Sequence, residues 1–150
     1  MKVKIGKFPN HYFWHSWLYS LFGYSPEQRV KVKIHKYDTW SMDQTLAPII
    51  LPMLVQLKAT QHGHPANLTE KEWDDILDEM IWAFEQKSRD DWEADYYGPY
   101  IEGEDDKFLN GCKFLNGRFE WTDDKGRQKH QARMTNGFKL FGKYYENLWD

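Results

Sequence analysis

A polar, aromatic loop that runs directly into an apolar helix is the feature that most constrains this chain. Ser41 and Gln44 have the spacing of a capping box, and Asp43 places negative charge in the first turn, where the helix dipole favours it. The sequence therefore predicts a helix that starts here and reaches Lys58, bent at Pro52, which cannot donate a backbone hydrogen bond. Its apolar residues repeat at spacings of three and four, as on one helical face: Leu46, Ile49, Ile50, Met53, Leu54 and Leu57.

Composition narrows the class of protein. With 150 residues, of which 41% are hydrophobic, the chain is predicted to form one domain with a real core. Aromatic residues make up 17% of the chain, more than packing alone needs, so some rings should be exposed or line a pocket. The formal charge of −3 argues against binding to a phosphate backbone, and we expect no nucleic-acid partner.

Cysteine usage and the lack of long apolar runs indicate the compartment. The single cysteine, Cys112, excludes an internal disulfide and a zinc site built from several cysteines, and it fits a reducing environment. No apolar run approaches membrane-spanning length, and the N-terminus lacks the apolar core of a signal peptide. We therefore expect a cytosolic protein without a membrane partner.

Two segments alternate polar and apolar residues, which is the period of a β-strand. They are residues 2–8 and residues 29–36, and the second would carry Val30, Val32 and Ile34 on one face. Residues 11–22 are apolar nearly all round and predict a helix that Gly23 ends. A helix so rich in aromatic residues needs burial on more than one side, for instance against another subunit.

A second amphipathic helix is predicted after the His-Gly turn. Thr69 and Glu72 repeat the spacing of a capping box, and the apolar stripe that follows is expected to pack antiparallel against the stripe of the first helix. Its members are Trp73, Ile76, Leu77, Met80, Ile81 and Phe84.

The last third of the chain combines turns with a closing helix. Residues 114–121 are predicted to form a hairpin around Asn116 and Gly117. From Gln128 onward a helix is predicted, in which Gly137 and Gly142 would permit close packing or the approach of a ligand. Its apolar stripe is Met134, Phe138, Phe141, Tyr145 and Leu148. Together the elements predict an α+β fold, with a small antiparallel or mixed sheet of the Val3 and Val30 strands packed by about four helices.

The loop before the first helix is the leading candidate for a binding site. Tyr37 and Trp40 would stack on a flat ring, while Asp38, Thr39 or free N–H groups of the helix N-terminus would hold polar or anionic groups. The competing interpretation is that both rings are core and the polar residues are caps. The candidate residues of this loop are Tyr37, Asp38, Thr39, Trp40, Met42 and Asp43.

Basic and aromatic residues of the closing helix form a second candidate. Arg133 and Lys139 would meet phosphates, and Tyr144 or Phe141 would lie against a sugar or base. A solvated basic face is, however, the ordinary role of such residues.

Histidines and carboxylates form the remaining candidates. His62 and His64 flank a glycine as metal ligands can, but loop histidines are more often surface residues, and no catalytic metal motif accompanies them. Asp75 and Glu79 share a helical face and could hold magnesium, whereas such acidic sets are usually the solvated side of a helix. The leading interpretation counts His62 and His64 among the ligand-binding residues, and it includes neither a metal nor a cofactor.

Several segments resemble an uncharacterised family of small proteins from tailed bacteriophages. They are residues 36–43 (KYDTWSMD), 49–54 (IILPML), the His62-Gly63 turn, 77–84 (LDEMIWAF) and 136–145 (NGFKLFGKYY), in this order along most of the chain. Family members tend to carry a longer acidic insert after the His-Gly turn, whereas residues 65–68 lead directly into the next helix here. The resemblance implies an accessory protein that acts in the host cytoplasm.

Rings, cations and this resemblance together predict a protein that binds and sequesters a small nucleotide-like ligand without catalysis. By analogy of class with phage proteins that capture such signals, the ligand would be a nucleotide of bacterial immunity, and the binder a homo-oligomer. One alternative is a metal-dependent phosphodiesterase that uses His62, His64, Asp75 and Glu79. A further alternative is an inhibitor that docks its aromatic helix on a host protein.

Overall fold

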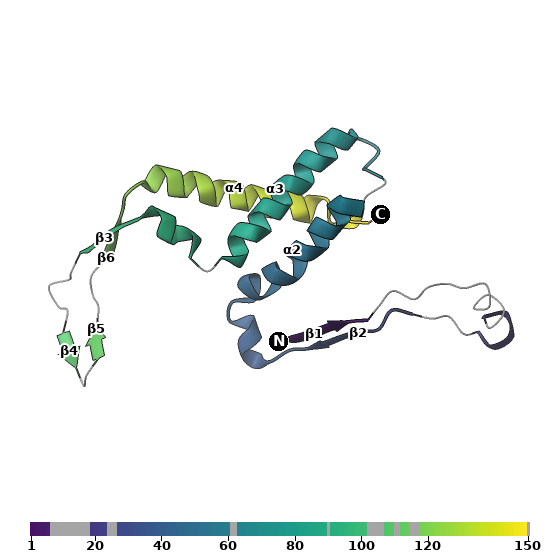
Figure 1. Ribbon diagram of the computed structural model, residues 1–150, viewed down its shortest axis with the longest axis horizontal. Coiled ribbons are helices and arrows are strands. Elements are labelled where there is room, and N and C mark those ends of the chain that lie inside the picture. The colour runs from purple at the N-terminus through teal and green to yellow at the C-terminus, as the bar shows by residue number, and fades with distance from the viewer. Residues whose placement is uncertain are drawn as a thin grey trace. The chain divides into compact units, whose positions relative to one another are not determined.

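Helices and short antiparallel strands make up the protein, which has the predicted α+β class (Figure 1). The computed structural model describes residues 1–6, 19–23, 27–60, 63–89, 91–101, 107–109, 112–114 and 118–149. Its elements are β1 (Lys2–Ile5), β2 (Val30–Lys33), η1 (Lys36–Thr39), α2 (Met42–Thr60), α3 (Glu70–Ser88), η2 (Trp92–Tyr96), β3 (Tyr97–Ile101), β4 (Lys107–Leu109), β5 (Cys112–Phe114), β6 (Arg118–Trp121), α4 (Asp124–Lys143) and η3 (Tyr145–Asn147).

The chain divides into two compact units, Met1–Thr45 and Leu46–Asp150, and each is described by itself below. The expectation of a single domain stays a prediction. Among the described residues, no helix is both long enough and apolar enough to cross a membrane.

Strands β1 and β2 form the antiparallel hairpin of the first unit (Figure 1). Their alternation is confirmed, because the register pairs Val3 with Val32 and Ile5 with Val30 on one face. This face is not covered by the residues that the structure describes, since Val30 and Val32 are each 56% exposed. Both strands are shorter than predicted, and Lys36, the last residue of the second predicted strand, is the first residue of η1.

The predicted aromatic helix is described only at its end. Residues 19–22 are helical, and Gly23, with φ of 63°, donates its N–H to the Tyr19 carbonyl at 2.9 Å. Gly23 therefore ends this helix, as predicted, in the left-handed conformation that glycine adopts without strain. Residues 11–18 lie outside the described part of the chain.

Helices α3 and α4 form the centre of the second unit. Phe84 of α3 meets Phe138 and Phe141 of α4 edge to face, with ring centroids 5.2 and 5.0 Å apart. Gly137 allows the two backbones to approach, because a Cβ atom there would lie 2.4 Å from the Ala83 Cβ. The prediction that this glycine permits close packing is confirmed, whereas Gly142 has open space beside it.

Helix α2 contributes less to this core than its sequence suggested. It runs through both of its prolines, and Ala47 and Leu54 join the buried cluster of α3, so the two predicted stripes do meet. Leu46 and Met53, however, are 37% and 59% exposed. The chief partner of α3 is therefore α4 rather than α2.

The capping box of α3 is confirmed. Thr69 Oγ1 accepts from the Glu72 N–H at 3.3 Å, and a Glu72 carboxylate oxygen accepts from the Thr69 N–H at 2.8 Å. The hydrogen bonds from Thr69 lower the pKa of Glu72. The four largest buried side chains on this helix are Trp73, Leu77, Met80 and Phe84, all of which belong to the predicted stripe.

The predicted hairpin around Asn116 and Gly117 is wrong. Strand β5 pairs with β4, and β6 pairs with β3, so that Tyr97 lies opposite Trp121. The chain carries three Asn-Gly dipeptides, at 110–111, 116–117 and 136–137, so the dipeptide by itself does not identify which strands pair, and long-range contacts decide the pairing. The rings of Tyr97 and Trp121 support the pairing observed, with centroids 5.1 Å apart.

Three aromatic rings surround His130 beside this core. Its imidazole stacks on Trp92 at 4.7 Å, lies 4.9 Å from Trp82, and places Nδ1 3.0 Å from the Tyr96 hydroxyl. The Nε2 atom is buried and has no hydrogen-bond partner among the described residues. Burial lowers the pKa of His130 below 6.5, Asp95 opposes this shift, and the cations Arg89 and Arg133 add to it.

Acid is predicted to weaken the second unit through His130. Because its pKa is lowered in the folded state, the unfolded chain binds more protons once the pH falls below 6.5, and the free energy of unfolding then decreases. We expect the urea midpoint to fall between about pH 7 and pH 5, and to fall less in His130→Phe. His64→Phe alters an exposed histidine, and its urea midpoint should fall with pH as much as that of the wild type. If the midpoint fell equally in all three proteins, His130 would not be the cause.

Two glycines of α4 provide a matched test of the helix contact. Gly137→Ala should destabilise the protein by about 1–3 kcal/mol, because its Cβ would lie 2.6 Å from the Glu79 carbonyl oxygen, which is backbone and cannot move aside. Gly142→Ala meets nothing within 4 Å and should stabilise α4 by roughly 0.5–1 kcal/mol. Urea denaturation of both variants measures the difference, and changes of the same sign would refute the close approach.

Candidate ligand-binding site

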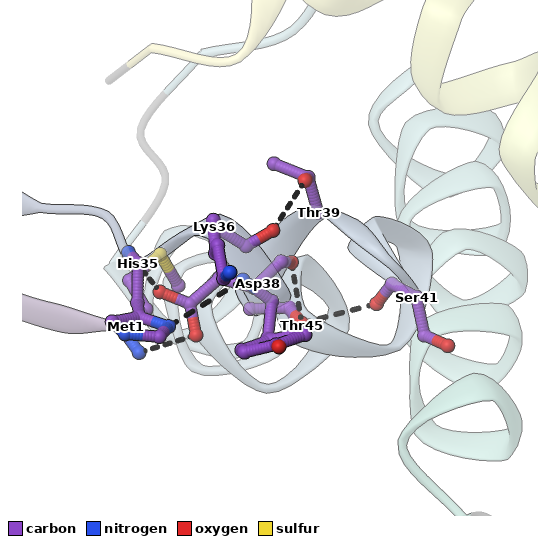
Figure 2. Close-up of polar contacts among 8 residues, drawn as sticks. Met1, His35, Lys36, Asp38, Thr39, Ser41 and Thr45 are labelled. Carbon is purple, nitrogen blue, oxygen red and sulfur yellow. Dashed lines mark hydrogen bonds and ion pairs between the residues drawn. The ribbon is translucent and has the colours of Figure 1, made fainter.

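Residues between β2 and α2 form a single 3₁₀ turn, η1, held by a capping box (Figure 2). An Asp38 carboxylate oxygen accepts from the His35 N–H at 2.6 Å, and the His35 imidazole accepts a longer bond, 3.5 Å, from the Tyr37 N–H. Thr45 Oγ1 donates toward the carbonyls of Asp38 and Ser41, at 3.2 and 3.0 Å. This capping box of His35 and Asp38 was not predicted, and the one predicted at Ser41 and Gln44 stays a prediction.

Asp38 is fully engaged in holding this turn. Its second carboxylate oxygen lies 2.6 Å from the N-terminal ammonium of Met1, and its side chain is only 17% exposed (Figure 2). The ammonium group and the His35 N–H both lower the pKa of Asp38. Asp38 thus joins the start of β1 to η1, and its carboxylate has few positions left for a ligand.

The two rings of the loop are exposed, so the interpretation that they are core is wrong. Tyr37 is 67% exposed and Trp40 is 89% exposed. Tyr37 stacks on His35 with ring centroids 5.5 Å apart, and the Lys36 ammonium lies 4.9 Å from its centroid. This arrangement offers two exposed aromatic rings, one of which has a cation beside it.

The other candidates of the loop differ in availability. Thr39 donates its hydroxyl to the Lys36 carbonyl at 3.1 Å and so serves the turn (Figure 2). Met42, 56% exposed, and Asp43, also exposed, begin α2 and remain accessible to solvent.

Four lysines beside η1 were not identified from the sequence. The hairpin register places Lys2 opposite Lys33 and Lys4 opposite Lys31, so that all four share one face. They border a hollow of about 550 Å³. The signal was present as alternating lysines in both strands, and an antiparallel pairing of those strands would have revealed the shared face.

Arg133 of α4 is not free to bind a phosphate. Its guanidinium makes two hydrogen bonds to the Glu79 carboxylate, at 2.7 and 3.0 Å, and covers the Trp82 ring at 3.9 Å. The carboxylate of Glu79 raises the pKa of Arg133. The pair joins α4 to α3, and it uses the carboxylate that the phosphodiesterase alternative requires.

Tyr144 is a core residue, which corrects its assignment as a stacking ring. It is 6% exposed and meets Trp73 edge to face at 5.5 Å, whereas Tyr145 is 65% exposed. Helix α4 ends at Lys143 and η3 follows with a tighter winding, which shifts the phase that the heptad count assumed. Lys139 is exposed on α4 and stays available.

The histidine turn yields no metal site within the described residues. His64 is exposed, and its Nδ1 lies 3.1 Å from the Pro65 carbonyl oxygen, while His62 lies outside the described part of the chain. No three His, Cys, Asp or Glu side chains of the described ranges gather closely enough to hold a metal ion.

A large apolar groove lies within the second unit. It has a volume of about 710 Å³ between α2 and the end of α4. Its wall consists of Leu46, Ile50, Met53, Leu54, Leu57, Phe141, Tyr145 and Leu148.

The candidate residues thus fall into two groups. The rings and carboxylates of η1 and the start of α2 belong to the first unit, and the cations of α4 belong to the second. Comparison with protein-family models, with curated proteins and with solved structures found no match for this chain.

Proposed function

We propose that the protein binds a small nucleotide-like ligand at the exposed rings of η1 and sequesters it without chemical change. The observation that carries this proposal is the exposure of Tyr37 and Trp40, at 67% and 89%, on a turn whose backbone is fixed by Asp38. Exposed rings on a rigid turn lose little conformational freedom when a flat ligand stacks on them.

The energetics of stacking make such binding measurable. Each base stacked on an aromatic side chain contributes roughly 1–3 kcal/mol, and a millimolar dissociation constant corresponds to about 4 kcal/mol. Two rings, with the Lys36 ammonium 4.9 Å from the Tyr37 centroid to attract an anionic group, therefore support an affinity of this order or better.

A signalling nucleotide of the bacterial host is the ligand class that we propose. The resemblance to small tailed-phage proteins supports a role in removing such a signal from the host cytoplasm. Arg133 and Tyr144 are no longer part of the proposed site, because the first is paired with Glu79 and the second is buried.

Contact with a partner protein is a second candidate function, and the apolar groove of the second unit favours it. A groove of about 710 Å³ with an apolar wall is the kind of surface that accepts hydrophobic side chains of another protein. The phosphodiesterase alternative has less support, because the Glu79 carboxylate is held by Arg133 at 2.7 Å.

Calorimetric titration of the full chain with mononucleotides, cyclic ADP-ribose and cyclic dinucleotides tests the leading proposal. We expect at least one dissociation constant below about 1 mM, and Trp40→Ala should weaken it about tenfold, since a lost stacking contact costs roughly 1–3 kcal/mol. The matched control is Trp149→Ala, which removes another exposed tryptophan, 71% exposed, outside η1.

Recovery of the ligand distinguishes sequestration from turnover. Mass spectrometry after incubation with Mg²⁺ or Mn²⁺ should return the nucleotide intact. A chemically altered nucleotide would favour the phosphodiesterase, and no measurable heat with any ligand of the panel would refute nucleotide binding.

A further inference from the structure

The β1–β2 hairpin carries a face made of lysine alone. Lys2 faces Lys33 and Lys4 faces Lys31 directly across the antiparallel pair, and all four are exposed. Opposed residues of an antiparallel pair have Cα atoms about 4.5–5.5 Å apart, and alternate residues of one strand lie about 6.8 Å apart. Four positive charges therefore occupy a small rectangle.

This arrangement works against the stability of the hairpin. Like charges directly opposite each other destabilise an antiparallel pair, and a two-stranded hairpin has little stability to spare. None of the ion pairs found among the described residues engages the four lysines. Their charge is thus uncompensated within the described part of the chain.

Charge is also divided unequally between the two units. Residues 1–45 contain seven Lys and Arg against three Asp and Glu, a formal charge of +4, and the rest of the chain contains 13 against 20, a formal charge of −7. We expected no nucleic-acid partner because the whole chain has a formal charge of −3. The first unit alone, however, is basic. Such local segregation is the electrostatic footprint of a polyanion site.

Protection against aggregation does not account for the face. Lysines on an exposed strand do discourage edge-to-edge pairing. Solubility, however, is served by both signs of charge interspersed, whereas this face contains cations only. The opposite face of the same hairpin remains apolar and exposed, with Ile5 at 50% and Val30 at 56%, so the lysines do not shield it.

We propose that the lysine face binds the phosphodiester chain of single-stranded nucleic acid, with Tyr37 and Trp40 as stacking platforms for its bases. A face about 7 Å long is long enough to meet about two successive phosphates of such a strand. Proteins that bind single strands combine a cationic track with exposed aromatic rings in this way.

The structure places the rings at one end of this track. Lys33 ends β2 two residues before His35, which stacks on Tyr37, and Met1, beside Lys2, is tied to Asp38 of η1 at 2.6 Å. The Lys2–Lys33 pair is therefore adjacent to η1 along both strands. The role given to the rings depends on the proposed function. The role given to the lysine face depends only on the register of β1 and β2.

Fluorescence anisotropy with a labelled oligothymidylate of about 12 nucleotides, a length within the site sizes of single-strand binders, tests the inference on the full chain. We expect binding that weakens with salt. Each phosphate neutralised contributes about −0.7 to the slope of log K against log salt, so Lys31→Gln with Lys33→Gln should make the slope shallower by about 1.4 and weaken binding at least tenfold.

A matched double variant controls for charge. Lys125→Gln with Lys129→Gln removes the same charge from exposed positions of α4 and should leave the affinity for the oligonucleotide unchanged. Circular dichroism should show Lys31→Gln with Lys33→Gln folded, because it relieves repulsion. Equal loss in both double variants, or binding of anionic lipid vesicles or an acidic peptide in place of the oligonucleotide, would overturn the inference.

Parallel titrations separate the two proposals. In one outcome a mononucleotide binds through Trp40, and the oligonucleotide binds no better than millimolar. That outcome would refute nucleic-acid binding by the lysine face and leave the proposed function intact. If the oligonucleotide bound in a salt-dependent way that needed the lysines but not Trp40, the lysine face would be confirmed as its site. The stacking role of Tyr37 and Trp40 would then be wrong.

Discussion

The contact between α3 and α4 at Gly137 is the constraint on which the second unit depends. With no side chain there, α4 approaches the α3 backbone near Glu79 and Ala83 closely enough for Phe138 and Phe141 to reach Phe84. The same approach brings the Arg133 guanidinium to the Glu79 carboxylate and the Trp82 ring. A residue that looks like a helix breaker in the sequence is thus the position that lets two helices share one core.

Features set by neighbouring residues were predictable, and features set by distant ones were not. The capping box of Thr69 and the buried stripe of α3 follow from spacings of three and four within one helix. The Arg133–Glu79 pair joins residues 54 positions apart, so the sequence displayed a free cation and a free carboxylate where the structure has a bidentate pair. Pairing of β6 with β3, rather than with β5, is long-range in the same sense.

The candidate site shows the same division. Position and composition of the η1 loop were evident from the sequence, and its rings are exposed as a binding role requires. Burial of Tyr144 depends on where α4 gives way to η3, and a shift of one residue exchanges the roles of Tyr144 and Tyr145. Helix ends are set by competition between similar local energies, so periodicity alone cannot fix which of two adjacent tyrosines faces inward.

The arginines of the second unit and the lysines of the β1–β2 hairpin have different surroundings, and this difference separates structural charge from charge available to a ligand. In the second unit, Arg89, Arg127 and Arg133 each meet a carboxylate within 3.3 Å, and Lys58 pairs with Asp78. A guanidinium that already holds a carboxylate must release it before it can bind a phosphate, which cancels much of the gain. The hairpin lysines have no such partner to release among the described residues, and their mutual repulsion falls when an anion arrives. An anion bound to the hairpin lowers the electrostatic repulsion among the four lysines. For this reason the hairpin is a better anion site than the arginines of α4.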